Sequence, residues 1–226
     1  MEKTLSGRIK RIALLNLLVA AILSLTACSA FFTVVPIVEE KSLEEGGSAT
    51  NKGFDKVAYV DKIWDSKVLP TVKEKAIPFD TLYTALKLNQ DDASQKYGNK
   101  VGGPYNFLTS FDAKVTRVNT TSRAGTLEVT TQAAGTDVLL IIQIGPVIQG
   151  TSIRDAMGFI TFNEFVNQLQ FADVADELNT RAYNMSLKDK TFNDALIGKT
   201  ISVTGAFTLD SGLDKLTITP IYFEIK

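Results

Sequence analysis

The sequence contains no histidine and only one cysteine, Cys28, among its 226 residues. Without histidine there is no Ser-His-Asp triad and no zinc site built from His and Cys ligands. A single cysteine leaves no pair for an intrachain disulfide. These absences remove the commonest forms of nucleophilic and metal catalysis, so we expect no metal and no cofactor. A Ser–Lys dyad stays conceivable, although no spacing marks one.

Neither sign of charge is in excess. The chain has 24 Lys and Arg residues against 25 Asp and Glu residues, for a net charge of −1. The first 27 residues hold four of the bases and one of the acids, so the remainder carries 20 bases against 24 acids. A domain with this balance has no general electrostatic attraction for nucleic acid, which we therefore do not expect as a partner.

The N-terminus has the parts of a bacterial export signal. Four basic residues precede an apolar run over 12–25: Lys3, Arg8, Lys10 and Arg11. The run ends at Leu25-Thr26-Ala27-Cys28, which matches the lipobox, where an aliphatic residue and two small residues precede the cysteine that receives lipid. This pattern predicts a signal peptide over 1–27, lipid on Cys28, and a domain held at the membrane on its periplasmic or extracytoplasmic face.

An uncleaved signal anchor is the alternative. Apolar residues continue past Cys28, so that residues 12–38 are long enough to cross a bilayer. Both interpretations put the basic residues inside and the domain outside. The sequence allows either lipid or an anchor helix, and either the inner or the outer membrane.

A polar stretch over 39–52 contains Gly46-Gly47-Ser48 and predicts a flexible linker. From residue 53 to 226 we expect a single domain, helical over 53–98. Apolar spacing predicts a first helix from Phe54 to Lys75 that Pro70 kinks or breaks, with Trp64 in the core. Two shorter helices should follow before Gly98.

From residue 104 the pattern is that of strands. Five strand-like runs cover residues 105–117, 126–130, 137–144, 200–209 and 216–225. The third run is continuously apolar, which is typical of a central strand covered on both faces. In the last two runs, Gly205 predicts a tight bend and Pro220 an edge or a bulge.

One long helix should separate the third strand from the fourth. Thr161 and Glu164 have the T-x-x-E spacing of a capping box, and apolar residues recur at helical spacing from Phe162 to Leu178. The order β-β-β-α-β-β predicts an α+β protein: a five-stranded antiparallel OB-like Greek-key barrel over 104–226, preceded by a helical segment. An open antiparallel sheet with the helix across one face is the rival architecture.

The segment from Ile144 to Ala156, followed by Phe162 to Gln168, resembles the signature of an uncharacterised family of predicted periplasmic lipoproteins, domain of unknown function 2291. Three further stretches share the resemblance: Tyr59 to Pro70, Ser122 to Thr126 and Thr204 to Phe207. The resemblance covers about residues 54–225. It implies an OB-like barrel and an association with sugar-type ABC import systems, and it carries no assigned activity.

Arginine and acid candidates for a site lie in two turns. Arg154 and Asp155 follow a Gly-rich stretch, where the pair could orient a sugar hydroxyl or a carboxylate, or could pin the loop to the barrel. We favour the second role, because such loops need their polar backbone groups satisfied. Arg123 lies in a predicted hairpin turn and serves either a partner or only solvent.

Amide candidates gather at the start of the long helix. Asn163, Asn167 and Gln168 offer both donors and acceptors, which suits carbohydrate hydroxyls and equally suits loop carbonyls. No catalytic residue and no metal ligand stands out.

The sequence therefore favours a membrane-anchored extracytoplasmic accessory or binding protein without catalytic activity, with a protein or a carbohydrate as its partner. A cell-envelope hydrolase is the alternative, and it needs two facing carboxylates roughly 5–10 Å apart. An oligosaccharide-binding OB module is a further alternative, and an oligonucleotide binder would rest on fold analogy alone.

Overall fold

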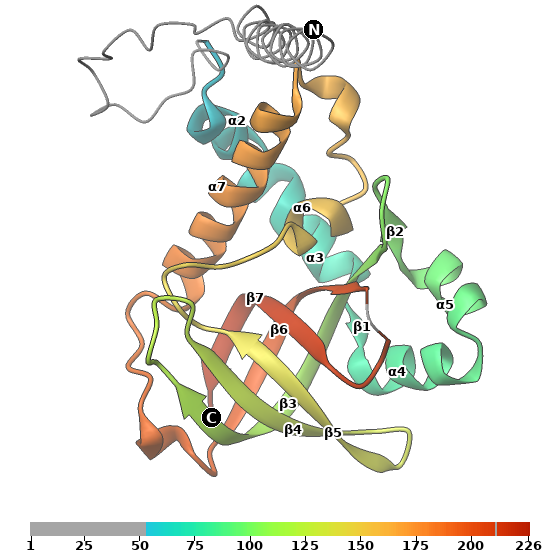
Figure 1. Cartoon of the computed structure of the whole chain (residues 1–226), viewed down its shortest axis with the longest axis vertical. Helices are drawn as coiled ribbons and strands as arrows, with labels where there is room; N and C mark the ends of the chain where they lie inside the picture. Colours follow the sequence, from blue (N-terminus) through green and yellow to red (C-terminus); the bar gives the residue numbers. More distant parts are fainter. Residues whose placement is uncertain (1–52, 211) are drawn as a thin grey trace, which may run out of the picture. The chain divides into compact units, whose positions relative to one another are not determined.

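The computed structural model describes residues 53–210 and 212–226, so the predicted signal, Cys28 and the linker lie outside the described residues. Within these ranges, we find no helix with the length and apolar character needed to span a bilayer. Figure 1 shows the described chain as a twisted sheet, with α2, α3, α6 and α7 gathered at one end and α4 and α5 beside it.

Pro70 does not break the first helical stretch. The chain runs through α2 (Lys56–Ile63), a π-helical turn η1 (Trp64–Val68) and α3 (Leu69–Lys75) without interruption. Proline lacks an N–H, and its ring collides with the carbonyl four residues earlier in a regular α-helix. The wider π turn directly before Pro70 alters this register. Trp64 is buried, as the sequence predicts.

Two short helices follow, close to their predicted positions. These are α4 (Phe79–Leu88) and α5 (Gln90–Tyr97), and Asn89 caps the second by accepting a hydrogen bond from the Asp92 amide at 3.2 Å. Two short strands, β1 (Ile77–Pro78) and β2 (Asn99–Lys100), both pair with β3.

Five long strands pair in a closed cycle. They are β3 (Tyr105–Asn119), β4 (Thr126–Ala133), β5 (Thr136–Gln143), β6 (Thr200–Leu209) and β7 (Leu216–Ile225). The order β3-β4-β5-β7-β6 returns to β3, because β3 is long enough to pair with β6 over its first part and with β4 over its last. The pairing therefore excludes the open sheet.

The sequence predicts an antiparallel barrel, and this prediction is wrong for one pair of the long strands. β5 and β7 run parallel, with Leu140 opposite Leu216 and Ile142 opposite Ile218. The chain between β5 and β6 crosses over through α6 (Ser152–Ala156) and α7 (Gln168–Ser186). After this crossover β6 runs opposite to β3, and the turn after β6 sends β7 in the same direction as β5.

The prediction that the third strand is covered on both faces is wrong. β5 lies between β4 and β7, but only alternate side chains, Val138, Leu140 and Ile142, point into the core. Leu139, on the other face, is 49% exposed. Although its sequence is continuously apolar, β5 alternates between buried and exposed side chains, as in a sheet with one face on the core.

Gly205 and Pro220 lie opposite each other at a bulge. The β6–β7 register shifts between Thr204 and Gly205, and Gly205 pairs with Pro220. A β-carbon on Gly205 would lie 2.4 Å from the Thr219 carbonyl oxygen, so only glycine fits there. The predicted bend and bulge are therefore one feature.

The predicted long helix is divided in two. The capping box of Thr161 and Glu164 is present, but it opens only a 3₁₀ turn, η2 (Phe162–Glu164). Phe165 then adopts extended backbone angles, and α7 begins after a second cap, Asn167. The buried Phe165 ring packs against Tyr59 and Phe171, so tertiary packing overrides the local helical period.

The core has two parts. One fills the interior of the closed sheet and includes Leu127, Leu140, Ile218 and the stacked rings of Phe107 and Phe207. A second cluster lies between the helices and the outer face of the sheet. Most of its members come from α2, η1, α3, α6 and α7 and from β3, β6 and β7, and they include Val60, Trp64, Val72, Leu108, Ile153, Leu178, Ala206 and Ile221.

Candidate functional site

Arg154 and Asp155 form a buried pair in α6. The Arg154 Nε and Nη2 atoms each lie 2.7 Å from Asp155 Oδ1, and Arg154 Nη1 donates to the Phe171 carbonyl at 2.8 Å. The guanidinium also lies 3.5 Å from the centre of the Phe171 ring. Asp155 in turn accepts from the Thr151 hydroxyl at 2.5 Å.

Contacts around the pair anchor α6 and the segment before it to neighbouring elements. The Asp155 carbonyl accepts from Asn99 Nδ2 at 2.5 Å, which joins α6 to β2. Asn179 of α7 donates to the Gly150 carbonyl at 2.9 Å, one position before Thr151. Arg154 and Asp155 do not line the cavities described below, and the contacts support the pinning role rather than a ligand role.

The three amide candidates do not form a group with one purpose. Asn167 is the cap of α7 and accepts from the Gln170 amide at 2.9 Å, so it serves the helix start. Asn163 lies exposed in η2, and Gln168 is exposed in the first turn of α7. None of the three lines the cavities described below.

Arg123 lies in the wall of a cavity of about 620 Å³ at one end of the closed sheet. We call this the Arg123 pocket. It is lined by the β3–β4 turn, by the chain just after β5, and by two aromatic residues near the end of α7: Thr120, Thr121, Ser122, Arg123, Gly125, Ile144, Gly145, Pro146, Tyr183 and Phe192.

The turn that carries Arg123 has a fixed backbone. The amides of Ile144 and Gly145 both donate to the Gly125 carbonyl, at 2.9 and 3.1 Å, and the Val147 amide donates to the Arg123 carbonyl at 3.1 Å. Asn119 Oδ1 accepts from the Thr121 hydroxyl at 2.8 Å. The β3–β4 turn and the segment after β5 thus hold each other in place.

The Arg123 side chain, by contrast, is exposed, and no hydrogen bond or ion pair engages its guanidinium within residues 53–210 and 212–226. A guanidinium presents donors in a planar fork that matches a carboxylate or a phosphate. Tyr183 and Phe192 add apolar ring surface, and Phe192 is oriented by an edge contact with Phe223 at 5.7 Å. The arrangement suits a ligand that has an anionic group, hydroxyls and an apolar ring face.

A second cavity, of about 350 Å³, has a more polar lining, but several of its polar side chains already form hydrogen bonds with one another or with backbone. Gln143 Nε2 donates to the Gln149 carbonyl and to Thr219 Oγ1, both at 2.9 Å, and Gln143 Oε1 accepts from the Gln149 amide at 2.7 Å. Ser152 and Thr219 share a further contact at 3.1 Å. A ligand would have to displace these internal bonds, so this cavity is the weaker candidate.

A third cavity, of about 430 Å³, contains two carboxylates, those of Asp80 and Asp112. Asp80 Oδ1 accepts from the Ala134 amide at 2.8 Å, and Asp112 Oδ2 accepts from Lys226 Nζ at 2.6 Å. The hydrogen bond from Lys226 lowers the pKa of Asp112 below its ordinary value. A general acid needs the opposite shift, so these contacts do not favour a carboxylate-based hydrolase.

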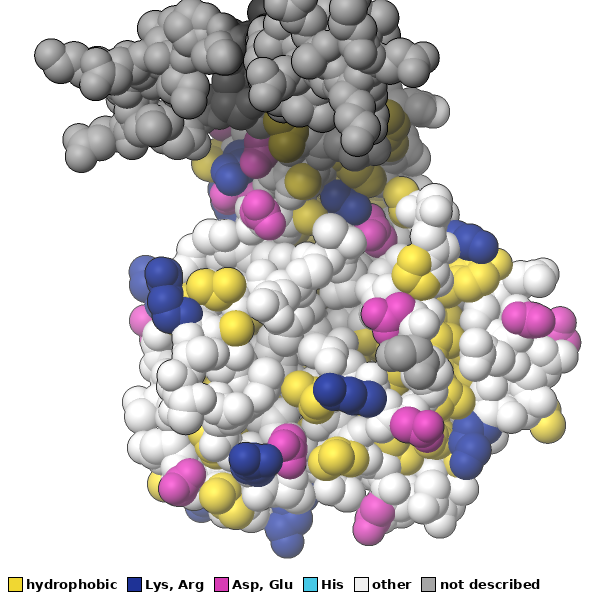
Figure 2. Space-filling model, viewed as in Figure 1, with side chains coloured by type: hydrophobic (Ala, Val, Ile, Leu, Met, Phe, Trp, Pro, Cys, Tyr) yellow, Lys and Arg dark blue, Asp and Glu magenta, His cyan; other side chains and the backbone are white. Residues whose placement is uncertain are grey.

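Charges of both signs are mixed on the surface in view. Figure 2 shows Lys and Arg side chains interspersed with Asp and Glu over that face, without a region of one sign. Within the described part of the chain, no group of three or more His, Cys, Asp or Glu residues could hold a metal ion.

The sequence indicates one wall of the Arg123 pocket and carries no signal for the others. The sequence places Arg123 in a predicted hairpin turn. Tyr183 and Phe192 carried no signal, because one follows the helical period and the other lies in an irregular segment. The structure brings them to Arg123 from positions 60 and 69 residues further along the chain.

These features define an α+β protein with an OB fold. A solved structure of an OB-fold protein from Thermotoga maritima is similar to this chain, with a TM-score of 0.60 and 20% identity, covering 77% of this chain and 99% of that chain. The chain belongs to the family of predicted periplasmic lipoproteins, domain of unknown function 2291 (DUF2291), whose model matches residues 18–224. No curated protein matches the chain.

Family membership confirms the predicted resemblance and the location. The protein is a membrane-anchored protein of the extracytoplasmic side, and the family description as lipoproteins agrees with the lipobox. Lipid on Cys28 itself stays a prediction, because Cys28 lies outside the described residues.

Proposed function

We propose that this chain is an extracytoplasmic binding protein without catalytic activity, and that its ligand is a carbohydrate with an anionic group. The single observation that carries the proposal is the exposed Arg123 side chain in the wall of a pocket that Tyr183 and Phe192 also line, with no partner for its guanidinium among the described residues. Sugar rings stack on aromatic faces, their hydroxyls suit the Thr and Ser side chains of the turn, and a carboxylate suits the arginine.

Fold analogy points to the same place. The closed pairing of the five long strands supports an OB-like Greek-key barrel, in which β3 and β4 are the first two strands. OB folds bind oligosaccharides and oligonucleotides through loops that include the one between these strands. Arg123 lies in that loop, although the analogy is one of position and not of chemistry.

The absence of catalysis is part of the proposal. It is supported by the engagement of Asp80 and Asp112, the two carboxylates that share a cavity, in other contacts. An association with a sugar-type ABC import system would give such a binding protein a partner. Pull-down of the full-length protein from solubilised membranes, followed by identification of enriched transporter subunits, tests that association separately.

Binding is tested with the full-length protein in nanodiscs, by calorimetry against uronic acids and their neutral counterparts. An arginine–carboxylate hydrogen-bonded pair contributes about 1.5–3 kcal/mol, so Arg123→Ala should weaken binding of the acidic sugar roughly 10- to 100-fold. Binding of the neutral sugar should change little.

Arg117→Ala is the matched control. It removes the same charge from the neighbouring strand, but Arg117 is already paired with Glu128 at 3.2 Å. If both variants weaken binding of the acidic sugar equally, the effect comes from the overall charge of the domain and not from a contact with Arg123. No binding of any acidic or neutral sugar by the unsubstituted protein would overturn the proposal.

A further inference from the structure

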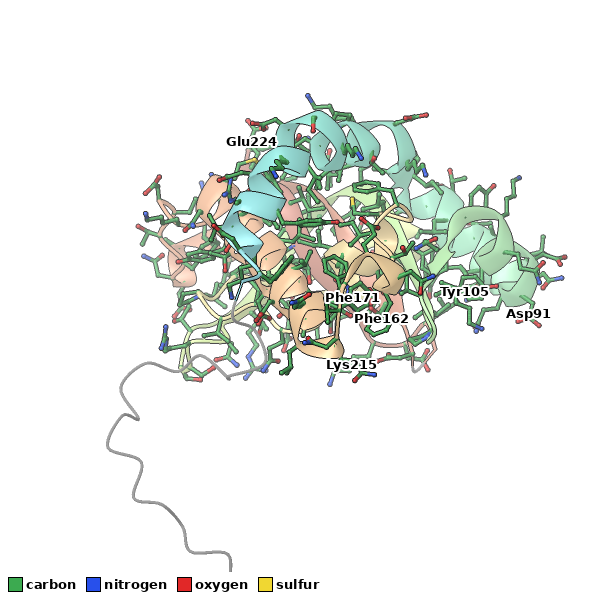
Figure 3. The ribbon with its side chains drawn as sticks, turned by 90° about the horizontal axis from the view of Figure 1, so that it is seen from above. Asp91, Tyr105, Phe162, Phe171, Lys215 and Glu224 are labelled. Atoms are coloured by element: carbon green, nitrogen blue, oxygen red, sulfur yellow. The ribbon has the colours of Figure 1, made fainter. Side chains whose placement is uncertain are left out.

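Apolar side chains are exposed together where η2 meets α7. Phe162 is 42% exposed, Val166 87% and Leu169 48%. We call these three residues the apolar tip. Figure 3 shows Phe162 beside Phe171 at the start of α7, where their ring centres lie 5.7 Å apart.

The apolar tip is held by a rigid base. Phe165, between Phe162 and Val166, packs edge-on against Phe54 at 5.7 Å and against Tyr59 at 5.3 Å. The Tyr59 hydroxyl donates to Glu164 Oε2 at 3.1 Å, and Glu164 Oε1 accepts from the Thr161 amide at 2.9 Å. Glu164 thus ties the C-terminal end of η2 to α2 and, through Thr161, also holds its N-terminal end.

The exposure of Val166 does not come from a loosely held backbone. Its amide donates to Gln170 Oε1 at 3.1 Å, while Asn167 Oδ1 accepts from the Gln170 amide at 2.9 Å. This reciprocal cap fixes the chain on both sides of Val166. A fixed backbone that presents a valine, a leucine and a phenylalanine to solvent marks an interaction surface.

The chain leads from this surface to the membrane. Phe54, which contacts the base of the apolar tip, follows the predicted lipid site Cys28 by 26 positions. A chain of this length spans at most about 90 Å at full extension. If residues 12–38 form an anchor helix instead, the link is shorter. In either case the apolar tip is close enough to the bilayer for a high effective concentration.

We propose that the apolar tip inserts into the interface between lipid headgroups and hydrocarbon, as a second, weak membrane contact of this tethered domain. Partly buried Phe and Leu side chains are typical of interfacial membrane contacts. The acids near the tip already have partners, since Asp173 lies 3.9 Å from Lys56 and Glu164 is bound by Tyr59. The contact is therefore apolar and does not depend on anionic lipid.

The test uses full-length protein reconstituted into phosphatidylcholine vesicles. Val166→Cys is labelled with an environment-sensitive fluorophore, and brominated lipids serve as quenchers. Leu88→Cys is the matched control, because Leu88 on α4 is 88% exposed, is also apolar, and lies away from the apolar tip. The unsubstituted protein gives the background labelling of Cys28.

Insertion predicts a blue shift and bromolipid quenching at position 166, and neither at position 88. A label at Leu169→Cys should behave like position 166 and should lose its quenching when Val166→Asp is added. Trp64 emission, from the single tryptophan in the core, verifies that each variant is folded.

Other outcomes overturn the proposal. Absence of quenching at position 166, or equal quenching at positions 166 and 88, excludes a specific lipid contact. A blue shift without quenching means that protein covers the tip. That protein is a second copy if the shift depends on protein density in the vesicle, and is the chain's own apolar segment after Cys28 if it does not. Quenching that requires anionic lipid and low salt assigns the contact to charge instead.

Discussion

A β-carbon placed on Gly145 would lie 2.0 Å from the carbonyl oxygen of Arg123. It would also lie 2.3 Å from the Gly125 nitrogen. Side-chain atoms do not approach backbone this closely, so the turn that carries Arg123 packs against the segment after β5 only because residue 145 has no side chain.

We therefore expect Gly145→Ala to displace the Arg123 turn. The overpacking should cost about 1–3 kcal/mol of unfolding free energy, and sugar binding in the Arg123 pocket should weaken. Denaturant titration followed by Trp64 emission measures the first effect. Gly103→Ala is the control, because a β-carbon there meets nothing closer than 3.9 Å. Equal stability of both variants would contradict the close packing.

Removal of Arg154 should destabilise the fold far more than removal of Arg117. Arg154→Ala leaves the Asp155 carboxylate buried without its ionic partner, with only the Thr151 hydroxyl bond remaining, which costs about 3–5 kcal/mol. Arg117 and Glu128 are exposed, and such pairs contribute about 0–1 kcal/mol. Thermal unfolding of both variants compares them directly. If Arg154→Ala changes thermal unfolding only slightly but abolishes sugar binding, Arg154 binds the ligand and does not hold the fold.

Gly205→Ala should destabilise the seam between β6 and β7. A β-carbon at this bulge would lie 2.4 Å from the Thr219 carbonyl oxygen and 3.0 Å from the Pro220 α-carbon, and both belong to backbone that cannot turn aside. We expect a loss of at least about 2 kcal/mol in unfolding free energy. Hydrogen exchange should show faster exchange of amides in β6 and β7 than in β4, and uniform protection would contradict the prediction.

Tyr59 gives the stability a defined dependence on high pH. Burial, and then the nearby Glu164 charge, raise the pKa of Tyr59 above its ordinary 10.0. The unfolded chain therefore loses the Tyr59 proton at lower pH than the folded chain. The stabilisation from this residue is complete below pH 10.0 and declines as pH rises above it.

The variant Tyr59→Phe lacks this titration. Above pH 10 its urea midpoint should fall less steeply than that of the unsubstituted protein, since the remaining tyrosines titrate alike in both. Parallel curves from pH 8 to pH 11 would show that Tyr59 has no raised pKa.

Regular elements followed from the sequence wherever local pattern and tertiary packing agree. The bounds of β6 and β7, the burial of Trp64 and the bend at Gly205 all follow from the apolar period and the glycine position. The pattern was insufficient where long-range contacts compete with it. Phe165 follows the helical period, yet its packing with Tyr59 ends η2 and forces a new cap at Asn167.

The location of the protein and the five long strands follow from the sequence alone, because export signals and strand alternation are local properties of the chain, whereas the short strands β1 and β2 do not. Only the tertiary structure decided which polar residues are free to bind. Arg154 and Arg123 look alike in the sequence. Arg154 closes an ion pair with Asp155 inside the fold, whereas Arg123 has no partner among the residues that the structure describes and lines a cavity whose aromatic wall comes from Tyr183 and Phe192. Charge pairing and exposure depend on which distant segments meet, and that is set by packing rather than by neighbours along the chain.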